Sequence, residues 1–258
     1  MTGLLRDRRA RWAAAGIAVA LIGAWVATRI ADLSTDTQAT NPVVRWEWVF
    51  LREDTRTELW DATVQHLQLT VMAIGFGLAI AAVLAAVALR FRWTFTPITV
   101  FASFLYTIPS VALFGILVTR FGNTVSAEIA LTSYTLLVLV RNIVAGIDGV
   151  PPSVTDAADG LGMSRLRRLA TVELPLALPV IVAGIRVATV TTVGLVGITA
   201  IIQLGGLGSL IFDGYGTQYF TKMVVGSALS IALALVLDLA LHRVEVVLTP
   251  WARRRGAR

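Results

Sequence analysis

Six long apolar segments dominate the chain and limit what it can fold into. Each is close to the roughly 20 residues that an α-helix needs to cross the hydrocarbon core of a bilayer. Only 15% of the residues are charged, against about a quarter in soluble domains. Backbone groups in hydrocarbon must find their hydrogen bonds within the segment, so we predict an all-α integral membrane protein with about six transmembrane helices. The segments are Trp12–Thr28, Leu67–Leu89, Ile98–Val118, Thr124–Val140, Ala177–Leu204 and Met223–Leu241.

The distribution of arginine predicts the orientation. Arg6, Arg8, Arg9 and Arg11 precede the first segment, as in a signal peptide, but the apolar stretch is longer than a usual signal core and we expect an uncleaved helix. With the N-terminus inside, most arginines lie on the cytoplasmic side, as the positive-inside rule requires. We therefore expect both termini to be cytoplasmic, and we read the net charge of +6 as topology rather than as a nucleic-acid surface.

The outer loop before the second segment leaves two alternatives open. Its stretch WEWVFLREDTRTELW could form a short helix on the membrane surface, anchored by Trp46, Trp48 and Trp60. A solvated loop with scattered aromatic residues fits the same letters. We divide the chain into 1–61 (basic tail, first helix and outer loop), 62–250 (the core transmembrane domain) and 251–258 (a basic cytoplasmic tail).

Several kinds of chemistry are excluded by missing residue types. The chain has no cysteine, so disulfides and thiolate metal sites are ruled out. Its only lysine, Lys222, lies between Thr221 and Met223, so there is no P-loop to hold ATP. His66 and His242 are the only histidines, and we expect no metal site. We expect no enzyme activity and no cofactor in this chain.

A hydrophilic stretch, SVTDAADGLGMSRLRRLATVELPLALP, interrupts the apolar pattern at Ser153–Pro179. We predict that Ser153 caps a first short helix and forms a capping box with Asp156. Glycine, at Gly160 or Gly162, would end that helix in the left-handed conformation. A second short helix would then run from its cap at Ser164 to about Glu173 and be bounded by Pro175 and Pro179.

The resulting hairpin would carry a small face and an apolar ridge. The small face comprises Ala157, Ala158 and Gly162, and the ridge comprises Leu161, Met163, Leu166 and Leu169. An exposed ridge with neighbouring arginines indicates docking of a soluble partner. A hairpin that folds back on its own helices, with its arginines at lipid headgroups, is the alternative.

Single residues inside the apolar segments are further candidates. An intramembrane cation such as Arg186 usually lines a water-filled path or pairs with a carboxylate, here Asp238, although it could also snorkel to the headgroups. Pro109 and Ser110 would either open the backbone or simply kink a helix. We expect Glu128 to be solvated near the outer surface and His66 to be an interface or capping histidine. Our candidates for the translocation pathway or its gates are Pro109, Ser110, Asn142, Arg186, Gly205, Gly206 and Gly208.

The hydrophilic stretch also resembles a known motif. Asp156-Ala157-Ala158, three residues, Gly162, nine residues and Val172-x-Leu174-Pro175 are similar to the EAA loop of bacterial ABC-importer permeases, with Asp156 in place of Glu and Val172 in place of Ile. The resemblance extends over about Gln65–Pro250. Within that range the chain resembles the osmoprotectant subgroup of these permeases. The stretches that carry this resemblance are HLQLT (66–70), TIPSVALFGIL (107–117), VRNIVAGI (140–147), GGLGSLIF (205–212) and ALVLDLALHRVEVVLTP (234–250).

The resemblance implies a type I ABC-importer permease fold with a cytoplasmic coupling loop at 153–175. It implies a bacterial inner-membrane subunit that moves glycine betaine, choline, carnitine or proline. Two ABC ATPase subunits carrying ATP and Mg²⁺, a second permease (identical or related) and an external binding protein or lipoprotein would be its partners. Another small solute, such as methionine, or a stand-alone secondary transporter are the alternatives. The implied coupling residues are Asp156, Ala157, Ala158, Gly162, Arg165, Leu166, Arg168, Leu174 and Pro175, with Arg167 as a further polar anchor.

Overall fold

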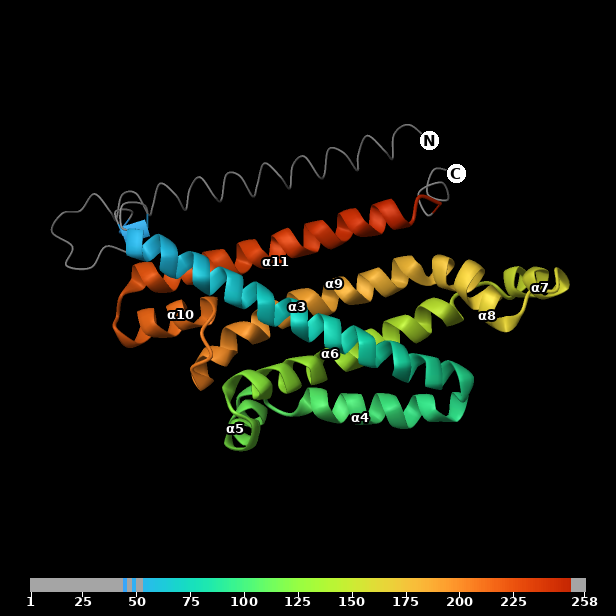
Figure 1. Ribbon diagram of the computed structural model, residues 1–258, viewed down its shortest axis with the longest axis horizontal. Coiled ribbons are helices and arrows are strands. Elements are labelled where there is room, and N and C mark those ends of the chain that lie inside the picture. Colours follow the sequence, from blue (N-terminus) through green and yellow to red (C-terminus); the bar gives the residue numbers. More distant parts are fainter. Residues whose placement is uncertain (1–43, 46–47, 50–52, 252–258) are drawn as a thin grey trace, which may run out of the picture.

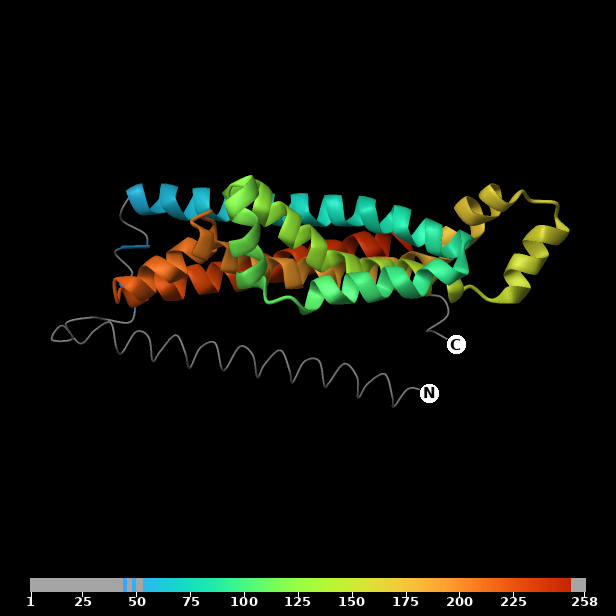
Figure 2. The same ribbon diagram turned by 90° about the horizontal axis from the view of Figure 1, so that it is seen from below.

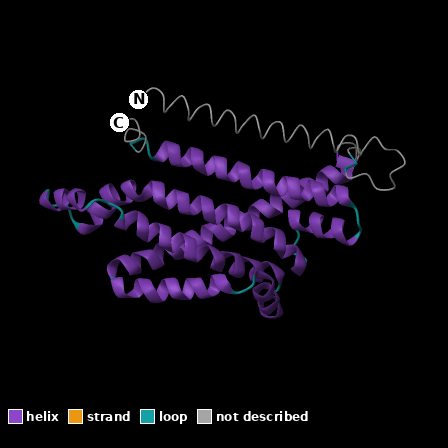
Figure 3. Ribbon diagram, turned by 180° about the vertical axis from the view of Figure 1, so that it is seen from behind, coloured by secondary structure: helices purple, strands orange, loops and turns teal. Residues whose placement is uncertain are grey.

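The computed structural model describes residues 44–45, 48–49 and 53–251, and all regular structure within them is helical (Figure 3). The long helices are α3 (Glu53–Arg90), α6 (Asn123–Asp148), α9 (Leu174–Ile198) and α11 (Phe220–Leu248). The shorter ones are α4 (Phe95–Thr107), α5 (Ser110–Phe121), α7 (Pro152–Gly160), α8 (Arg165–Arg168) and α10 (Leu207–Gly216). Single turns are the 3-10 segments η1 (Arg92–Thr94) and η3 (Thr199–Ile202) and the π-helical η2 (Leu169–Glu173).

The described residues contain four helical segments that are long and apolar enough to cross a membrane. A fifth is obtained if the bent pair α4–α5 is counted as one span. This agrees with the last five of the six predicted segments, and the first, Trp12–Thr28, lies outside the described residues. The four segments are Glu53–Arg90, Asn123–Asp148, Arg165–Ile202 and Phe220–Leu248.

Helices α3, α6 and α9 pack together at the centre of the bundle (Figure 1). Helices α4 and α5 lie against α6 on one side, and α11 lies against α9 and α10 on the other. A row of small residues, spaced four apart, faces α6 from α3, and it comprises Ala73, Gly77, Ala81 and Ala85. Lipid tails are as apolar as leucine, so the hydrophobic effect does not drive helices together within a membrane. Small residues stabilise such helix pairs instead, because they allow the backbones to approach closely and pack.

Pro109 breaks the third predicted segment instead of kinking it. Helices α4 and α5 meet at an angle of 92°, so of the two predicted alternatives at Pro109 and Ser110 the opened backbone is confirmed and the simple kink is wrong. Ile108 is extended (φ −65°, ψ 129°), as the residue before a proline prefers to be. The break frees the Ile108 carbonyl, which accepts a hydrogen bond from the Tyr134 hydroxyl at 2.7 Å.

The outer end of α3 also differs from the sequence prediction. The helix begins at Glu53, about four turns before the predicted span, so residues 53–60 are the start of α3 and not a separate helix on the membrane surface. Trp60 is exposed on this extension. Trp46 lies outside the described residues.

Candidate functional site

The hydrophilic stretch forms a helical hairpin that projects beyond one end of the bundle (Figures 1 and 2). Helix α7 leaves the end of α6, and α8 leads back through the π turn into α9. The predicted helix–turn–helix is therefore confirmed as a local structure. The hairpin is therefore joined directly to α6 and α9, two of the three central helices.

The start of the hairpin differs from the predicted capping box. Helix α7 begins at Pro152, after the extended Pro151, and no side chain caps it. Ser153 lies inside the first turn, and Asp156 is exposed instead of closing a box. Proline suits the first helical position because its φ is fixed and it has no N–H to be capped, so the proline pair sets the helix start.

The turn between the two helices is a Schellman motif centred on Gly162. Gly162 has φ +72°, its N–H donates to the Asp159 carbonyl at 2.9 Å, and the Met163 N–H donates to the Ala158 carbonyl at 3.2 Å. These two bonds satisfy carbonyls that the end of α7 would otherwise leave free. Of the two glycines predicted to end the helix, Gly162 adopts the left-handed conformation.

The second helix of the hairpin starts as predicted but does not stop at the prolines. The Ser164 hydroxyl caps α8 by accepting from the Arg167 N–H at 3.4 Å. The chain then continues through the π turn into α9, so that residues 165–202 form one helical run. Pro175 follows directly on the π turn within this run, and the predicted boundary at Pro175 and Pro179 is therefore wrong.

Arg168 holds the hairpin together from inside. Its Nη1 donates to Asp159 of α7, and its Nε donates to Glu173 at 2.6 Å. The predicted polar anchor is thus engaged within the chain, whereas Arg165 and Arg167 are exposed.

The apolar ridge of the hairpin is uncovered at its tip. Leu161 is 77% exposed and Leu166 is 76% exposed, while Ala158 is buried and Ala157 is exposed. Leucines projecting beyond the membrane-spanning bundle are costly in water and indicate a surface that another protein covers. The alternative, a hairpin folded back on the bundle, does not bury these two side chains.

A second constellation, Gln65 and His66, connects α3 to the glycine-rich segment before α10. The Gln65 side chain accepts from the Gly206 N–H at 2.9 Å and donates to the Leu204 carbonyl at 2.5 Å. The His66 ring is fully buried, contradicting the interface prediction, and its Nε2 lies 3.0 Å from the Val193 carbonyl while Nδ1 accepts from the Leu207 N–H. No sequence pattern singles out Gln65, which directly precedes the stretch HLQLT (66–70).

The glycines of this segment serve close packing. Gly205 and Gly206 have φ of +95° and +71°, and a β-carbon on Gly205 would overlap the Gln65 side chain. A β-carbon on Gly208 would overlap the Gly197 backbone. A packing turn therefore describes these glycines, and a gating role stays a prediction.

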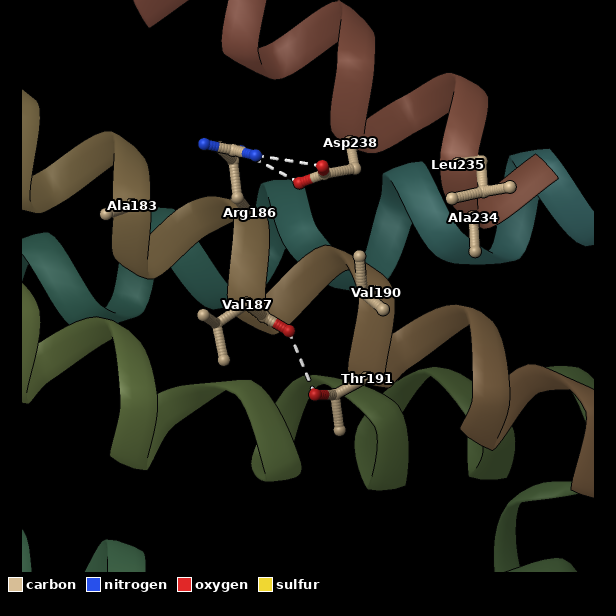
Figure 4. Close-up of a pocket in the computed structure, with 8 residues that line it drawn as sticks. All are labelled: Ala183, Arg186, Val187, Val190, Thr191, Ala234, Leu235 and Asp238. Atoms are coloured by element: carbon tan, nitrogen blue, oxygen red, sulfur yellow. Dashed lines mark hydrogen bonds and ion pairs between the residues drawn. The ribbon is translucent and has the colours of Figure 1, made fainter. Parts of the chain in front are cut away.

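The intramembrane cation Arg186 is paired, as one of its predicted alternatives stated. Its Nε and Nη2 donate to the two Asp238 oxygens at 2.8 Å each, linking α9 to α11 (Figure 4). Its Nη1 donates to Glu245 at 3.3 Å, and Glu245 also lies 3.4 Å from His242. Arg186 and Asp238 border a cleft of about 580 Å³.

The remaining pathway candidates lie elsewhere. Pro109 and Ser110 form the α4–α5 break, and Asn142 packs against Gly184 where α6 crosses α9. None of these residues borders the Arg186 cleft. Glu128, predicted to be solvated, instead has both carboxylate oxygens buried with no hydrogen-bond partner among the described residues. The same part of the chain contains no group of three side chains arranged as metal ligands.

Comparison with known proteins identifies relatives over most of the chain. A family model described as binding-protein-dependent transport system inner membrane component matches residues 73–253. The chain is 41% identical to the osmoprotectant import permease protein OsmW of Salmonella typhimurium, over 73% of this chain and 90% of that protein. It is 34% identical to the choline transport system permease protein OpuBB of Bacillus subtilis, over 77% of this chain and 92% of that protein.

A solved structure has the same fold. A chain of the MetNI methionine ABC transporter in an inward-facing conformation superposes with a TM-score of 0.67 at 20% identity. The match covers 77% of this chain and 99% of that chain. At this identity the likeness concerns the fold alone, and it confirms the predicted all-α architecture of a type I importer permease.

Proposed function

The chain belongs to the family of binding-protein-dependent transport system inner membrane components, and from that premise we propose that it is the permease of an ABC importer for a small osmoprotectant. Similarity to proteins named for osmoprotectant, choline and glycine betaine/carnitine/choline transport supports this substrate class. Proline extends the same class. Methionine is less favoured, because the MetNI likeness extends only to the fold.

The projecting hairpin is the observation that carries the coupling part of the proposal. The exposed Leu161 and Leu166 would seat in the ATPase subunit together with Asp156 and Ala157. Gly162 would set the turn, and the predicted contacts of Arg165, Leu174 and Pro175 would adjoin it. ATP and Mg²⁺ are then held by the partner chain, and this chain is a transport subunit without enzyme activity.

Hairpin movement would reach the membrane through α9. Because residues 165–202 form one helical run, a displacement of α8 by a closing ATPase would tilt α9 as a rigid body. Arg186 lies on α9 and is tied to α11 through Asp238, so both helices would move together. Alternation between inward- and outward-open states follows from such a motion.

The proposed assembly contains two permease chains, identical or related, two ATPase subunits and an external binding protein or lipoprotein. In the most apolar stretch of α11 only 6% of residues are buried within the described part of this chain, which leaves this surface available to lipid or to a further chain. We place the complex in the bacterial plasma membrane with both termini cytoplasmic, which puts the hairpin on the ATPase side. No nucleic acid takes part.

The test is uptake of glycine betaine, choline, carnitine and proline by the reconstituted complex, measured together with substrate-stimulated ATP hydrolysis. Leu161→Asp and Leu166→Asp place a charge on the proposed contact and should abolish the stimulation. Ser153→Asp adds the same charge to an exposed position of the same hairpin and should leave it intact. Normal coupling in both leucine variants would contradict the docking role, and no uptake of any of the four solutes would contradict the substrate class.

A further inference from the structure

The Arg186 cluster retains hydrogen-bonding capacity that the described chain does not use. A guanidinium has five N–H donors, and the contacts to Asp238 and Glu245 use three of them. One N–H on each terminal nitrogen is left without an acceptor among the described residues. Arg186 and Asp238 are accessible from the cleft, with side chains 28% and 31% exposed. The cluster therefore presents both donors and a carboxylate to whatever enters.

The depth of the cluster argues against exposure to lipid. Arg186 lies nine residues past the start of the apolar segment at Ala177, which is about 14 Å along the helix axis. Asp238 lies three residues before the end of the segment Met223–Leu241 and Glu245 lies four residues beyond it, so the cluster is within the cytoplasmic half of the two spans. Charged side chains within a span usually face protein or a water-filled cavity. The cleft beside Arg186 is thus suited to a solute in transit.

The charges of the cluster select the kind of solute. One guanidinium against the two carboxylates of Asp238 and Glu245 leaves a formal net charge of −1. An anion alone would meet this excess, and a cation alone would leave the unused N–H donors unpaired. A zwitterion satisfies both, because its carboxylate can accept from the terminal nitrogens of Arg186 while its cationic end faces Asp238.

The walls of the cleft suit the apolar part of such a solute. Val187 and Val190 of α9 and Leu235 of α11 border it, with Ala183 and Ala234 beside them (Figure 4). The remaining polar group, the Thr191 hydroxyl, donates to the Val187 carbonyl at 2.9 Å within its own helix. Aliphatic walls with one charged end can enclose methyl groups while leaving the charged cluster to orient the solute.

We propose that the α9–α11 cleft is a binding site for a small zwitterion with a carboxylate and an alkylammonium group, held by the unused N–H donors of Arg186 and by Asp238. The inference rests on the proposed function and deepens it, because it gives the membrane chain a solute site of its own. The ion pair then acts as a receptor that stays charge-paired when empty.

The test is equilibrium binding of radiolabelled glycine betaine and choline to the full complex in lipid nanodiscs without its external binding protein. Both ligands carry the same trimethylammonium group, and only glycine betaine has a carboxylate. Arg186→Lys keeps the positive charge but has no planar fork. We expect glycine betaine affinity to fall about tenfold or more, as for loss of a bidentate charge-assisted contact, with choline changed by less than about twofold.

Asp238→Asn should shift the ratio of glycine betaine affinity to choline affinity in the direction opposite to Arg186→Lys. Choline depends on the carboxylate alone and should lose more affinity than glycine betaine, which keeps its contact to Arg186. The control for Arg186→Lys is Arg243→Lys, which makes the same arginine-to-lysine change at an exposed position of α11 and should leave the affinity for both ligands unchanged. If Arg186→Lys does not assemble, Asp238→Asn alone tests the site. A merely structural ion pair predicts no larger loss of choline affinity than of glycine betaine affinity.

Two results would overturn the inference. One is the absence of saturable glycine betaine binding to the wild-type complex, and the other is an equal change for both ligands in the assembled variants. Neither result concerns uptake driven by the external binding protein. The proposed function therefore stands or falls separately, in the uptake experiment.

Discussion

Gly77 of α3 lies so close to Thr135 of α6 that a β-carbon at position 77 would overlap the Thr135 Oγ1 atom. The Thr135 hydroxyl already donates to the Thr132 carbonyl of its own helix, so it has a defined position. This contact lies in the row of small residues that joins the two helices. The packing of α3 on α6 therefore depends on the absence of a side chain at Gly77.

Gly77→Ala should destabilise the protein by about 1–3 kcal/mol, the usual effect of overpacking a filled interior. The measurement is the apparent melting temperature of the detergent-solubilised complex. Gly75→Ala is the matched control, because no described atom outside its own helix lies within 4 Å of the added β-carbon. Adding Thr135→Ala to Gly77→Ala should restore most of the lost stability, and equal melting temperatures for Gly77→Ala and Gly75→Ala would contradict the contact.

Gly162→Ala should weaken the hairpin through backbone strain alone. The residue has φ +72°, and an added methyl group would meet no other described residue within 4 Å, but a left-handed residue other than glycine costs about 1–2 kcal/mol. Substrate-stimulated ATP hydrolysis should fall, and trypsin should cut faster at the neighbouring arginines. Gly162→Asn should be milder, since asparagine tolerates this conformation.

Gly160→Ala separates strain from docking in the same turn. Gly160 lies within α7 and an added β-carbon there also meets open space, so this variant should be neutral or slightly stabilising. If Gly160→Ala impairs coupling as much as Gly162→Ala does, the effect comes from contact with the partner and not from the positive φ.

Local chemistry made two parts of the hairpin predictable, although the equally local capping box of Ser153 and Asp156 does not form. The Ser164 cap and the Gly162 turn depend on neighbouring residues only, and both form. The Arg186–Asp238 pair was predictable as an alternative because charged side chains are scarce in apolar helices. The break at Pro109 was predictable as one of two alternatives, because the residue before a proline prefers the extended conformation. The 92° angle and the π turn before Pro175 depend on how whole helices pack, which residue spacing does not encode.

Gln65→Ala should release the segment before α10 from α3. Its side chain bonds to Gly206 and to Leu204, residues about 140 positions away, which is why no local pattern revealed it. Loss of two partly buried hydrogen bonds should cost about 1–3 kcal/mol in unfolding free energy. Gln68→Ala, at an exposed position one turn along α3, should change it by less than about 0.5 kcal/mol. Equal effects of the two substitutions would contradict the proposed connection.

The two ion pairs of Arg168 should contribute unequally to the hairpin. Asp159 is 52% exposed and its attraction to Arg168 is screened by water, whereas the Glu173 side chain is 12% exposed. Arg168→Ala leaves Glu173 buried without its partner, so trypsin should cleave the hairpin much faster than in wild type, and Asp159→Asn should change the cleavage rate little. Combining Arg168→Ala with Glu173→Gln should recover part of the protection, because the amide carries no charge to leave unpaired. Cleavage in Asp159→Asn as fast as in Arg168→Ala would contradict this ranking and make the α7 contact the dominant one.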